Sequence, residues 1–388
     1  MDKDNARQTQ AVRAGIDTDT QHGAVMPPVY LTSNFSFAGF DNPRQHDYTR
    51  TSNPTRDSLA GVLADLEGGF GATVTGSGMG AVTLACQMLN PDDLIVGPRD
   101  CYGGTFRLLN GLAKRGLFRV KLVDQTDPQV LDAALSDGAK MLWVETPTNP
   151  LLRIVDLVQA KKLAEKHDAL MAVDNTFLSP ALQRPIEHGA DLVIHSTTKY
   201  LNGHSDMVGG AVVAADEDLH EQMQWWANAL GLTGSPFDSF LTMRGIRTLY
   251  ARMQQHEKNA STLAEVIGDH AAVGRVHYPG LKTHPGHEIA ARQQLGFGGM
   301  LSFDLTGGTA AARVFLETVE LFTLAESLGG VESLAAHPAT MTHATFDADS
   351  LAKAGITDGL VRLSIGIEAT EDLVRDVLLG LDAAATTG

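Results

Sequence analysis

The segment from Ala169 to Tyr200 constrains the fold more than any other part of the chain. It contains two short apolar runs, A-L-M-A-V-D-N-T and A-D-L-V-I-H-S-T-T-K-Y, separated by a turn and an amphipathic stretch. Runs of this length between turn-forming residues are typical of buried parallel strands. Because ligands of open α/β sheets bind at the carboxyl ends of the strands, the residues that follow each run are candidates for a functional site.

Each run ends in side chains that can take part in chemistry. Asp174 closes the first run, and Ser196, Thr198 and Lys199 follow the second. Taken singly, a turn-capping aspartate and a solvated lysine would be the commoner interpretation, since both residue types are mostly exposed. A carboxylate and an amine at successive strand ends instead suit pyridoxal phosphate. That cofactor needs a lysine for its Schiff base and a carboxylate to keep its ring nitrogen protonated.

A second candidate site is the glycine-rich segment T-G-S-G-M-G, which follows a short strand and opens an apolar helix. Glycines in such a turn let backbone N–H groups and a helix N-terminus approach a phosphate closely. Gly76, Gly78 and Ala81 also match the loose dinucleotide pattern G-x-G-x-x-A. At this point a nicotinamide-dependent dehydrogenase is therefore an alternative to a pyridoxal phosphate enzyme.

Composition excludes several other classes of function. The net charge of −16 argues against nucleic acid or an anionic membrane as a partner, because both require basic patches. Only Cys86 and Cys101 are present, so neither a disulfide framework nor a cysteine zinc site is expected. His277, His284 and His287 lack the carboxylates or cysteines that would complete a metal site.

The pattern along the chain predicts three parts: a polar N-terminal segment (1–55), a large domain (56–250) and a small C-terminal α/β domain (251–388). By itself the N-terminal segment is more typical of a surface loop that leads into a helix near Pro54 than of an arm on a neighbouring subunit, and the family resemblance described below favours the arm. Strand and helix patterns alternate between about 72 and 215, as in a mostly parallel sheet. One long helix is expected from Phe237 to about Asp269, and a last helix with its cap at Thr370. The polar N-terminus has no signal-peptide core and no apolar run reaches membrane-spanning length, so a cytoplasmic location is expected.

Several longer motifs closely resemble those of the Cys/Met-metabolism family of pyridoxal phosphate enzymes, and the resemblance extends from Thr9 to Leu379. The motifs occur in the family's order: T-G-S-G-M-G, D-C-Y-G-G-T-F-R, E-T-P-T-N-P, V-D-N-T-F, H-S-T-T-K-Y-L-N-G-H-S-D, A-E-S-L-G-G-V-E-S-L and V-R-L-S-I-G-I-E. The resemblance implies an aspartate-aminotransferase-like α/β fold (fold type I). It also implies pyridoxal 5'-phosphate as the cofactor, and a homotetramer, a dimer of dimers, whose subunits share active sites. It favours this cofactor over a nicotinamide.

The resemblance also implies a role for individual residues. Lys199 would hold the cofactor through a Schiff base, Asp174 would pair with the ring nitrogen, and Tyr102 would stack on the ring. The phosphate would be held by the backbone N–H groups of Gly78 and Met79, the hydroxyls of Ser196 and Thr198, and Tyr48 and Arg50 from the neighbouring subunit.

For the substrate, Arg362 would bind the α-carboxylate in two-pronged geometry, helped by Ser327 and Asn149. Candidates for the distal ends of the substrates are Glu326, Asp47 and Arg107. Once released from the cofactor, Lys199 would act as the base at several substrate carbons, and Tyr102 is a second candidate for handling protons.

Within the family, H-D-Y-T-R, L-A-K-R-G, W-W-A-N and G-H-E-I-A-A-R-Q-Q resemble the bacterial members that make cystathionine from an O-acylated homoserine and cysteine by γ-replacement. An O-succinyl substrate is favoured, because Arg107 could bind a second carboxylate. The alternative is the related γ-lyase reaction, which cleaves cystathionine to cysteine, 2-oxobutyrate and ammonia. A non-catalytic binding module on the same fold is disfavoured, because each cofactor position holds a competent residue.

Overall fold

The computed structural model describes residues 5–344 and 346–387 and divides into two compact units. The first unit comprises the chain up to Asn90 together with Leu170–Tyr250. The second comprises Pro91–Ala169 and the chain from Ala251 onward.

Strands of the first unit form a sheet in the order β1-β7-β6-β5. Their bounds are β1 (Gly71–Thr75), β5 (Leu170–Asp174), β6 (Leu192–His195) and β7 (Gly210–Ala214). β5 and β6 are parallel, with Asp174 in register with Ile194, whereas β7 is antiparallel to both β6 and β1. All residues of β6 are buried, and β5 buries its three central residues, so the apolar runs around 170 and 192 are buried strands, as predicted.

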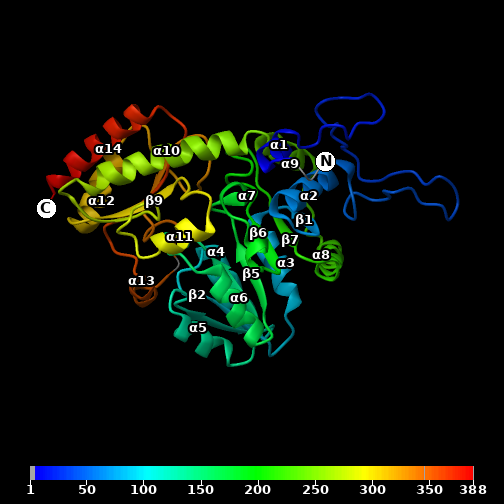
Figure 1. Cartoon of the computed structure of the whole chain (residues 1–388), viewed down its shortest axis with the longest axis horizontal. Coiled ribbons are helices and arrows are strands. Elements are labelled where there is room, and N and C mark those ends of the chain that lie inside the picture. The colour runs from blue at the N-terminus through cyan, green and yellow to red at the C-terminus, as the bar shows by residue number, and fades with distance from the viewer. Residues whose placement is uncertain (1–4, 345, 388) are drawn as a thin grey trace. The chain divides into compact units, whose positions relative to one another are not determined.

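Helices of the first unit begin and end at residues suited to those positions. They are α1 (Arg7–Val12), α2 (Pro54–Glu67), α3 (Gly78–Ala85), the 3₁₀ turns η1 (Cys86–Met88) and η2 (Pro185–His188), α7 (Ser179–Leu182), α8 (Glu217–Leu230) and α9 (Pro236–Ile246). In α2, the Asn53 side chain accepts from Thr55 N–H at 3.0 Å, Pro54 fills the first position, and Gly68 ends the helix with φ 80°. Helix α8 is closed in the same way by Asp216 and Gly231. Both helices pack on β1 and β7 (Figure 1).

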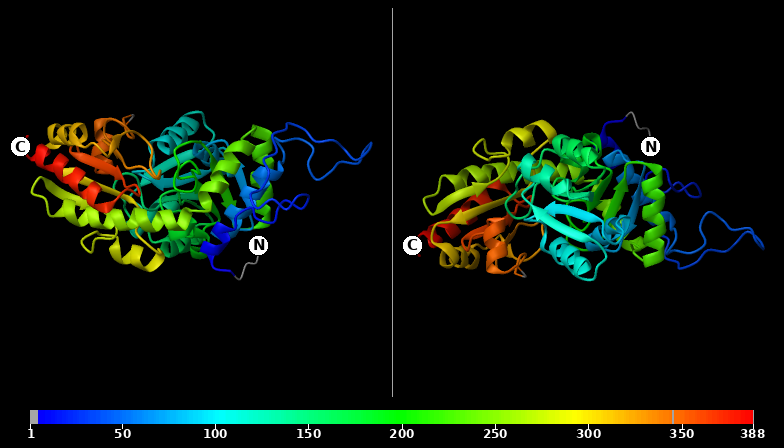
Figure 2. Two further views of the ribbon diagram at one scale, coloured as in Figure 1. Left: turned by 90° about the horizontal axis from the view of Figure 1, so that it is seen from above. Right: turned by 90° about the horizontal axis from the view of Figure 1, so that it is seen from below.

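An arm between about residues 20 and 50 projects away from α2 in both views of Figure 2. It contains isolated bridges between Asn34 and Tyr48 and between Gly39 and Asn42, and no longer strand. Its large apolar side chains are exposed, among them Leu31, Phe37 and Phe40. A segment that buries so little apolar surface does not offset its own ordering entropy, so its extended form is consistent with a second surface that covers it.

The second unit contains two sets of strands. One has the all-parallel order β4-β2-β3, and the other has the order β10-β11-β12-β9-β8. The strands are β2 (Leu94–Pro98), β3 (Arg119–Val123), β4 (Ala139–Glu145), β8 (Val273–His277), β9 (Met300–Leu305), β10 (Thr323–Leu324), β11 (Leu334–Ala336) and β12 (Leu360–Ser364). The helices are α4 (Gly103–Lys114), α5 (Pro128–Leu135), α6 (Leu157–Lys166), α11 (His287–Gln293), α12 (Gly308–Thr318), α13 (Ala348–Ala354) and α14 (Thr370–Ala385).

One hydrophobic core lies between the five-stranded sheet and three helices, α10 (Leu249–Gly268), α12 and α14 (Figure 1). Phe303 of β9 packs edge-on against Phe315 of α12, with ring centroids 5.3 Å apart. Both rings are fully buried, which fixes α12 on the sheet.

Two details differ from the sequence prediction. The single helix expected from Phe237 to Asp269 is two helices, α9 and α10, because the chain leaves the helix after Ile246. Gly245 approaches the backbone of Asn202 so closely that a Cβ would lie 2.1 Å from its carbonyl oxygen. The last helix does begin at Thr370, but its cap position is Ala369, and the Thr370 hydroxyl instead donates to Asn259 at 2.7 Å.

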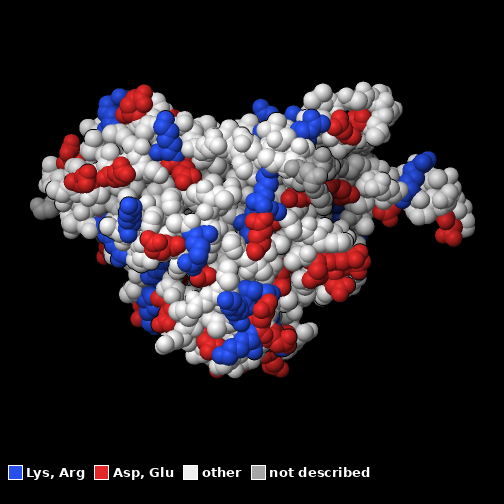
Figure 3. Space-filling model, in the orientation of Figure 1, with Lys and Arg blue, Asp and Glu red and all other residues white. Residues whose placement is uncertain are grey.

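Charged side chains of both signs are interspersed on the face shown in Figure 3. Surface ion pairs of the chain include Lys166 with Asp132 and Lys140 with Asp168, each at 2.8 Å. Among the described helices, none is both long and apolar enough to cross a membrane.

Candidate active site

The turn after β6 carries the candidate lysine on a rigid backbone. Thr197 N–H donates to Gly209 O at 3.0 Å, Asn202 N–H to Thr197 O at 3.0 Å, and Gly203 N–H to Lys199 O at 2.8 Å. Lys199 itself is half-buried. The sequence S-T-T-K-Y therefore forms a hydrogen-bonded turn that fixes the backbone of Lys199 while the long side chain keeps its own rotamers.

Asp174 lies at the end of β5, next to that turn in the same unit. Thr176 N–H donates to its Oδ1 at 3.0 Å, and the Thr176 hydroxyl accepts from Ser196 N–H at 2.9 Å, so one threonine links the two strand ends. Burial raises the pKa of Asp174, and this is only partly opposed by hydrogen bonds from Thr176 and by the nearby His195. A carboxylate in such a place gains from a cationic donor, and a protonated pyridine nitrogen is such a donor.

Helix α3 supplies a cradle of the kind that binds phosphate. Ser77 caps the helix by accepting from Gly80 N–H at 3.0 Å, while the N–H groups of Gly78 and Met79 precede the first intrahelical bond. Ser196 lies directly beside them, because a Cβ at Gly78 would be 2.7 Å from the Cβ of Ser196. Glycine is required for this approach, and an anion at the helix end would also gain from the helix dipole.

Thr198 is held at the same turn by Gly209, the residue before β7. Its hydroxyl accepts from Gly209 N–H at 3.0 Å and donates to Gly209 O at 3.3 Å. The candidate lysine, the carboxylate of Asp174, the N-terminus of α3 and the two hydroxyls all belong to the first unit. Together they supply the amine, the carboxylate and the phosphate-binding groups that pyridoxal phosphate needs.

The arm residues have other contacts within the single chain. Arg50 donates from Nη1 to the carbonyl and to Oδ1 of Asn228 on α8, at 2.9 and 3.0 Å, and lies 5.7 Å from the centre of the Tyr48 ring. It also lines a cavity of about 390 Å³ with residues of α2, β1 and α8. The hydrogen-bond and ring contacts of Arg50 in the described chain are thus not with the Gly78–Ser196 cradle. Asp47 is exposed and accepts from Tyr48 N–H at 2.6 Å.

A second group of predicted residues comes together in the second unit. Arg362 lies in the middle of β12 and is only 3% exposed. Its Nη1 donates to Asn149 Oδ1 at 3.0 Å and its Nη2 to Ser327 O at 2.9 Å. Ser327 has φ 111°, a conformation that is costly for a residue other than glycine. These contacts fix the plane of a buried guanidinium, which is the group suited to bidentate binding of a carboxylate.

Tyr102 precedes α4 and is 42% exposed. Its backbone N–H donates to Glu145 Oε2 at 2.8 Å, and the other oxygen of Glu145 accepts from Trp143 Nε1 at 3.2 Å. Arg107 and Glu326 are both exposed.

His343 was not singled out by the sequence, although it packs beside Arg362. It is fully buried, and its Nδ1 lies 2.9 Å from the Thr342 hydroxyl. Burial, and secondarily the positive charge of Arg362, lowers the pKa of His343 to about 4. The neighbouring Thr342 carbonyl would lie 2.6 Å from a Cβ at Gly103, so this turn also packs against the start of α4. The local sequence around His343 does not predict that this histidine is buried next to Arg362.

The three histidines considered for a metal have other partners. His277 lies 2.7 Å from Asp304 Oδ2, His284 accepts from Gly286 N–H at 3.0 Å, and His287 lies 2.8 Å from Pro279 O. Across residues 5–344 and 346–387, no cluster of three or more histidine, cysteine, aspartate or glutamate side chains is arranged to hold a metal ion.

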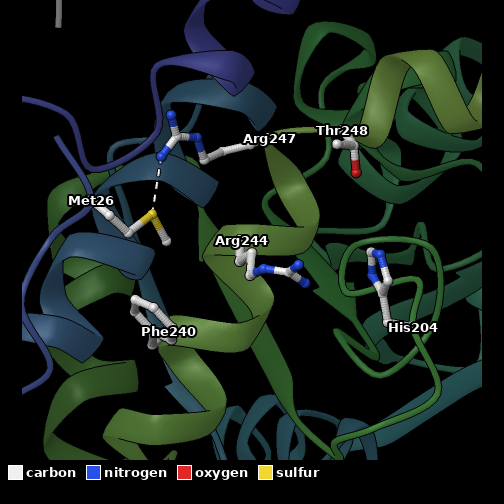
Figure 4. A pocket seen from close by; sticks show the side chains of 6 residues that line it. All are labelled: Met26, His204, Phe240, Arg244, Arg247 and Thr248. Atoms are coloured by element: carbon white, nitrogen blue, oxygen red, sulfur yellow. Dashed lines mark hydrogen bonds between the residues drawn. The ribbon is translucent and has the colours of Figure 1, made fainter.

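A cavity of about 420 Å³ in the first unit is separate from the predicted site residues. It is lined by Met26, His204, Phe240, Arg244, Arg247 and Thr248 (Figure 4). Arg247 donates to Met26 Sδ at 3.0 Å and to Val12 O at 3.1 Å, so it ties the N-terminal segment to α9.

Known proteins provide an independent comparison. The chain is 53% identical over 377 residues to cystathionine gamma-synthase of Escherichia coli, which covers 97% of this chain and 98% of that protein. It is 45% identical over 376 residues to cystathionine beta-lyase of Lactococcus lactis subsp. cremoris, and this match covers 97% of this chain and 98% of that protein. The crystal structure of cystathionine gamma synthase from Xanthomonas oryzae pv. oryzae in complex with cystathionine superposes with a TM-score of 0.98 at 60% identity, covering 99% of this chain and 100% of that one.

These likenesses confirm the predicted fold class, an α/β fold of the aspartate-aminotransferase type with a large, mostly parallel sheet and a smaller second sheet. Residues 8–382 match the model of the Cys/Met metabolism PLP-dependent enzymes, which confirms pyridoxal phosphate as the cofactor. The chain therefore belongs to the family of Cys/Met metabolism PLP-dependent enzymes.

Proposed function

We propose that this enzyme catalyses γ-replacement, in which L-cysteine displaces the acyl group of an O-acylated homoserine to give L-cystathionine. The bond between the γ-carbon and the acyl oxygen breaks, a bond between the γ-carbon and the cysteine sulfur forms, and the carboxylic acid leaves. The observation that carries this proposal is the full-length likeness to two gamma-synthases, at 53% and 60% identity, against 45% to a beta-lyase.

When bound, pyridoxal phosphate supplies an electron sink for negative charge that develops next to the substrate amino group. Asp174 would keep the ring nitrogen protonated, and Gly78, Met79, Ser196 and Thr198 would hold the phosphate. Tyr102 would stack on the ring, and it is a second candidate for moving a proton.

Lys199 would hold the cofactor covalently. Its amine, once free, would take the proton from the α-carbon and move protons at the neighbouring carbons in turn. The rigid turn from Ser196 to Gly209 keeps the origin of this side chain fixed, so that one base can reach several carbons.

Arg362, with Asn149 and Ser327, binds the α-carboxylate and so orients the carbon that reacts. For the distal end we favour a succinyl ester, because Arg107 on α4 is an exposed cation that suits a second carboxylate. Glu326 and Asp47 are the other candidates for contacts with the distal ends of the two substrates.

We propose that the chain consists of an arm (1–55), a large domain (56–250) and a small domain (251–388), and that it assembles into a homotetramer. In this assembly the arm brings Tyr48 and Arg50 to the phosphate of a neighbouring subunit. The exposed apolar side chains of the arm support it. Light scattering would give the mass. If sites are shared, mixing the inactive variants Arg50→Ala and Lys199→Ala should restore part of the activity, and no recovery in exchanged oligomers would contradict shared sites.

Product analysis tests the reaction itself. The purified enzyme is given O-succinylhomoserine with cysteine, O-acetylhomoserine with cysteine, or cystathionine alone. Cystathionine from the first mixture, with little breakdown of cystathionine, is the expected result. Release of cysteine, ammonia and 2-oxobutyrate would indicate the γ-lyase, and release of homocysteine, ammonia and pyruvate a β-lyase like the Lactococcus relative.

A further inference from the structure

A buried carboxylate lies behind the candidate cofactor site. Glu67 is the last residue of α2 and is fully buried. Its Oε1 accepts from Asn175 Nδ2 at 2.8 Å and lies 2.6 Å from His195 Nε2, and both partners are fully buried as well. An interior carboxylate is costly unless it is hydrogen-bonded, so these two contacts keep Glu67 in place.

The two partners of Glu67 occupy equivalent positions on neighbouring strands. Asn175 directly follows Asp174 at the end of β5, and His195 directly precedes Ser196 at the end of β6. Asp174 is in register with Ile194, and Asn175 N–H donates to Ile194 O at 3.0 Å. Since side chains alternate along a strand, Asn175 and His195 share the face opposite to that of Asp174.

Asn175 is held on its other sides by Gln183. Its Nδ2 also donates to Gln183 O at 2.8 Å, and its Oδ1 accepts from Gln183 Nε2 at 3.1 Å. The amide therefore cannot turn without breaking several buried hydrogen bonds, and its orientation sets that of the strand end that carries Asp174.

We infer that Glu67 is a positioning residue for the cofactor. Its one carboxylate ties together the strand ends that carry Asp174 and Ser196, and so fixes the spacing between the partner of the ring nitrogen and a partner of the phosphate. This inference rests on the proposed roles of Asp174 and Ser196.

The charged groups around Glu67 suit this role. His195 faces it from β6 and also favours the ionised form of Asp174. Tyr250 lies close enough that Glu67 contributes, after burial, to raising the pKa of this phenol to about 12, while Arg7 opposes that shift. The phenol is therefore neutral near pH 7 and adds no negative charge beside Glu67.

The test uses the purified holoenzyme of Glu67→Gln and Glu67→Ala. Asp376→Asn is the matched control, because Asp376 is also a buried carboxylate that accepts two hydrogen bonds, from Glu320 N–H at 2.9 Å and Leu321 N–H at 3.0 Å. Three quantities are measured for each variant. They are the dissociation constant of pyridoxal phosphate titrated into apoenzyme, the circular dichroism of the bound cofactor per mole bound, and the thermal midpoint of the apoenzyme.

In Glu67→Ala the dissociation constant should rise about tenfold or more, as when supporting groups behind a metal ligand are removed. The cofactor dichroism per mole should change, because the ring is held less firmly. Glu67→Gln keeps the size and one acceptor and should lie between this variant and the wild type. Asp376→Asn should lower the thermal midpoint and leave both cofactor readouts unchanged.

The inference is overturned if the Glu67 variants lower only the thermal midpoint, as the control does. Should Glu67→Ala fail to fold, Glu67→Gln decides the matter together with Asn175→Ala, which removes the other end of the bridge. Asp174→Asn and Ser196→Ala separate the two levels of the argument. If these leave cofactor binding and dichroism unchanged, the proposed site is wrong; if they change them and the Glu67 variants do not, only the role of Glu67 is wrong.

Discussion

Replacing Arg362 by lysine tests the proposed carboxylate site most directly. The substitution keeps a positive charge in the interior of β12 but removes the planar fork. Lysine has a single nitrogen at the end of a flexible chain, so it cannot reproduce both the bond to Asn149 Oδ1 and the bond to Ser327 O while facing a substrate carboxylate.

The expected loss follows from the contacts that Arg362 makes. A hydrogen bond to a charged group contributes about 1.5–3 kcal/mol. The lost protein contact is missing from the free enzyme as well, so it lowers stability and does not enter kcat/KM. The loss of one of two bonds to the substrate carboxylate costs about 1.5–3 kcal/mol, or about one to two powers of ten in kcat/KM. Because the carboxylate does not change during the reaction, KM should rise at least as much as kcat falls.

Steady-state kinetics of cystathionine formation would measure this effect, with the absorbance of the bound cofactor as a check that the variant is loaded. Arg292→Lys is the matched control, since Arg292 forms an exposed ion pair with Asp156 at 2.6 Å, and such pairs contribute little. A kcat/KM within tenfold of the wild type, with full cofactor loading, would refute the assignment of Arg362.

Two further predictions follow. Lys199→Ala should abolish turnover but can retain cofactor without the covalent link; substantial turnover in a direct activity assay would exclude Lys199 as the base. Burial lowers the pKa of His256, His284 and His343 to about 4 each, so the unfolded chain takes up protons first as the pH falls. The stabilisation from keeping these three histidines neutral in the folded state is complete above about pH 6.5. It is lost as the pH falls towards 4, and each histidine then lowers the free energy of unfolding by at most about 3 kcal/mol. The thermal midpoint should fall over this range, less so in His343→Gln, and a flat profile would contradict the argument.

Local pattern was enough to predict that Asp174, Ser196 and Lys199 lie at or just beyond the ends of neighbouring strands. Short apolar runs predict buried strands, and Asp174, Ser196 and Lys199 lie at or just after the ends of two such runs. The glycine at position 78 was likewise interpretable, because only a glycine lets a helix start approach another backbone so closely. A cytoplasmic location stays a prediction from the sequence.

Contacts between distant residues gave no such signal. Asn149 and Arg362 are 213 residues apart, and only the resemblance to a family predicted that they act together. From pattern alone, a glutamate at the end of a helix such as Glu67 is expected to be exposed. It is buried because β5 and β6 bring Asn175 and His195 to it, which is a consequence of strand register and not of the helix sequence.

The contrast between local patterns and contacts of distant residues also explains why the reaction outcome is harder to predict than the cofactor. Replacement and elimination both need a base such as Lys199 and a carboxylate such as Asp174, so these residues cannot decide between them. The choice depends on how the distal part of the substrate is held and on whether a second substrate can enter. The candidates for that task, Asp47, Arg107 and Glu326, are exposed side chains, whereas Arg362 is buried. If the proposed assignments hold, the reaction type is decided by exposed side chains, whereas the cofactor is bound by residues that packing fixes.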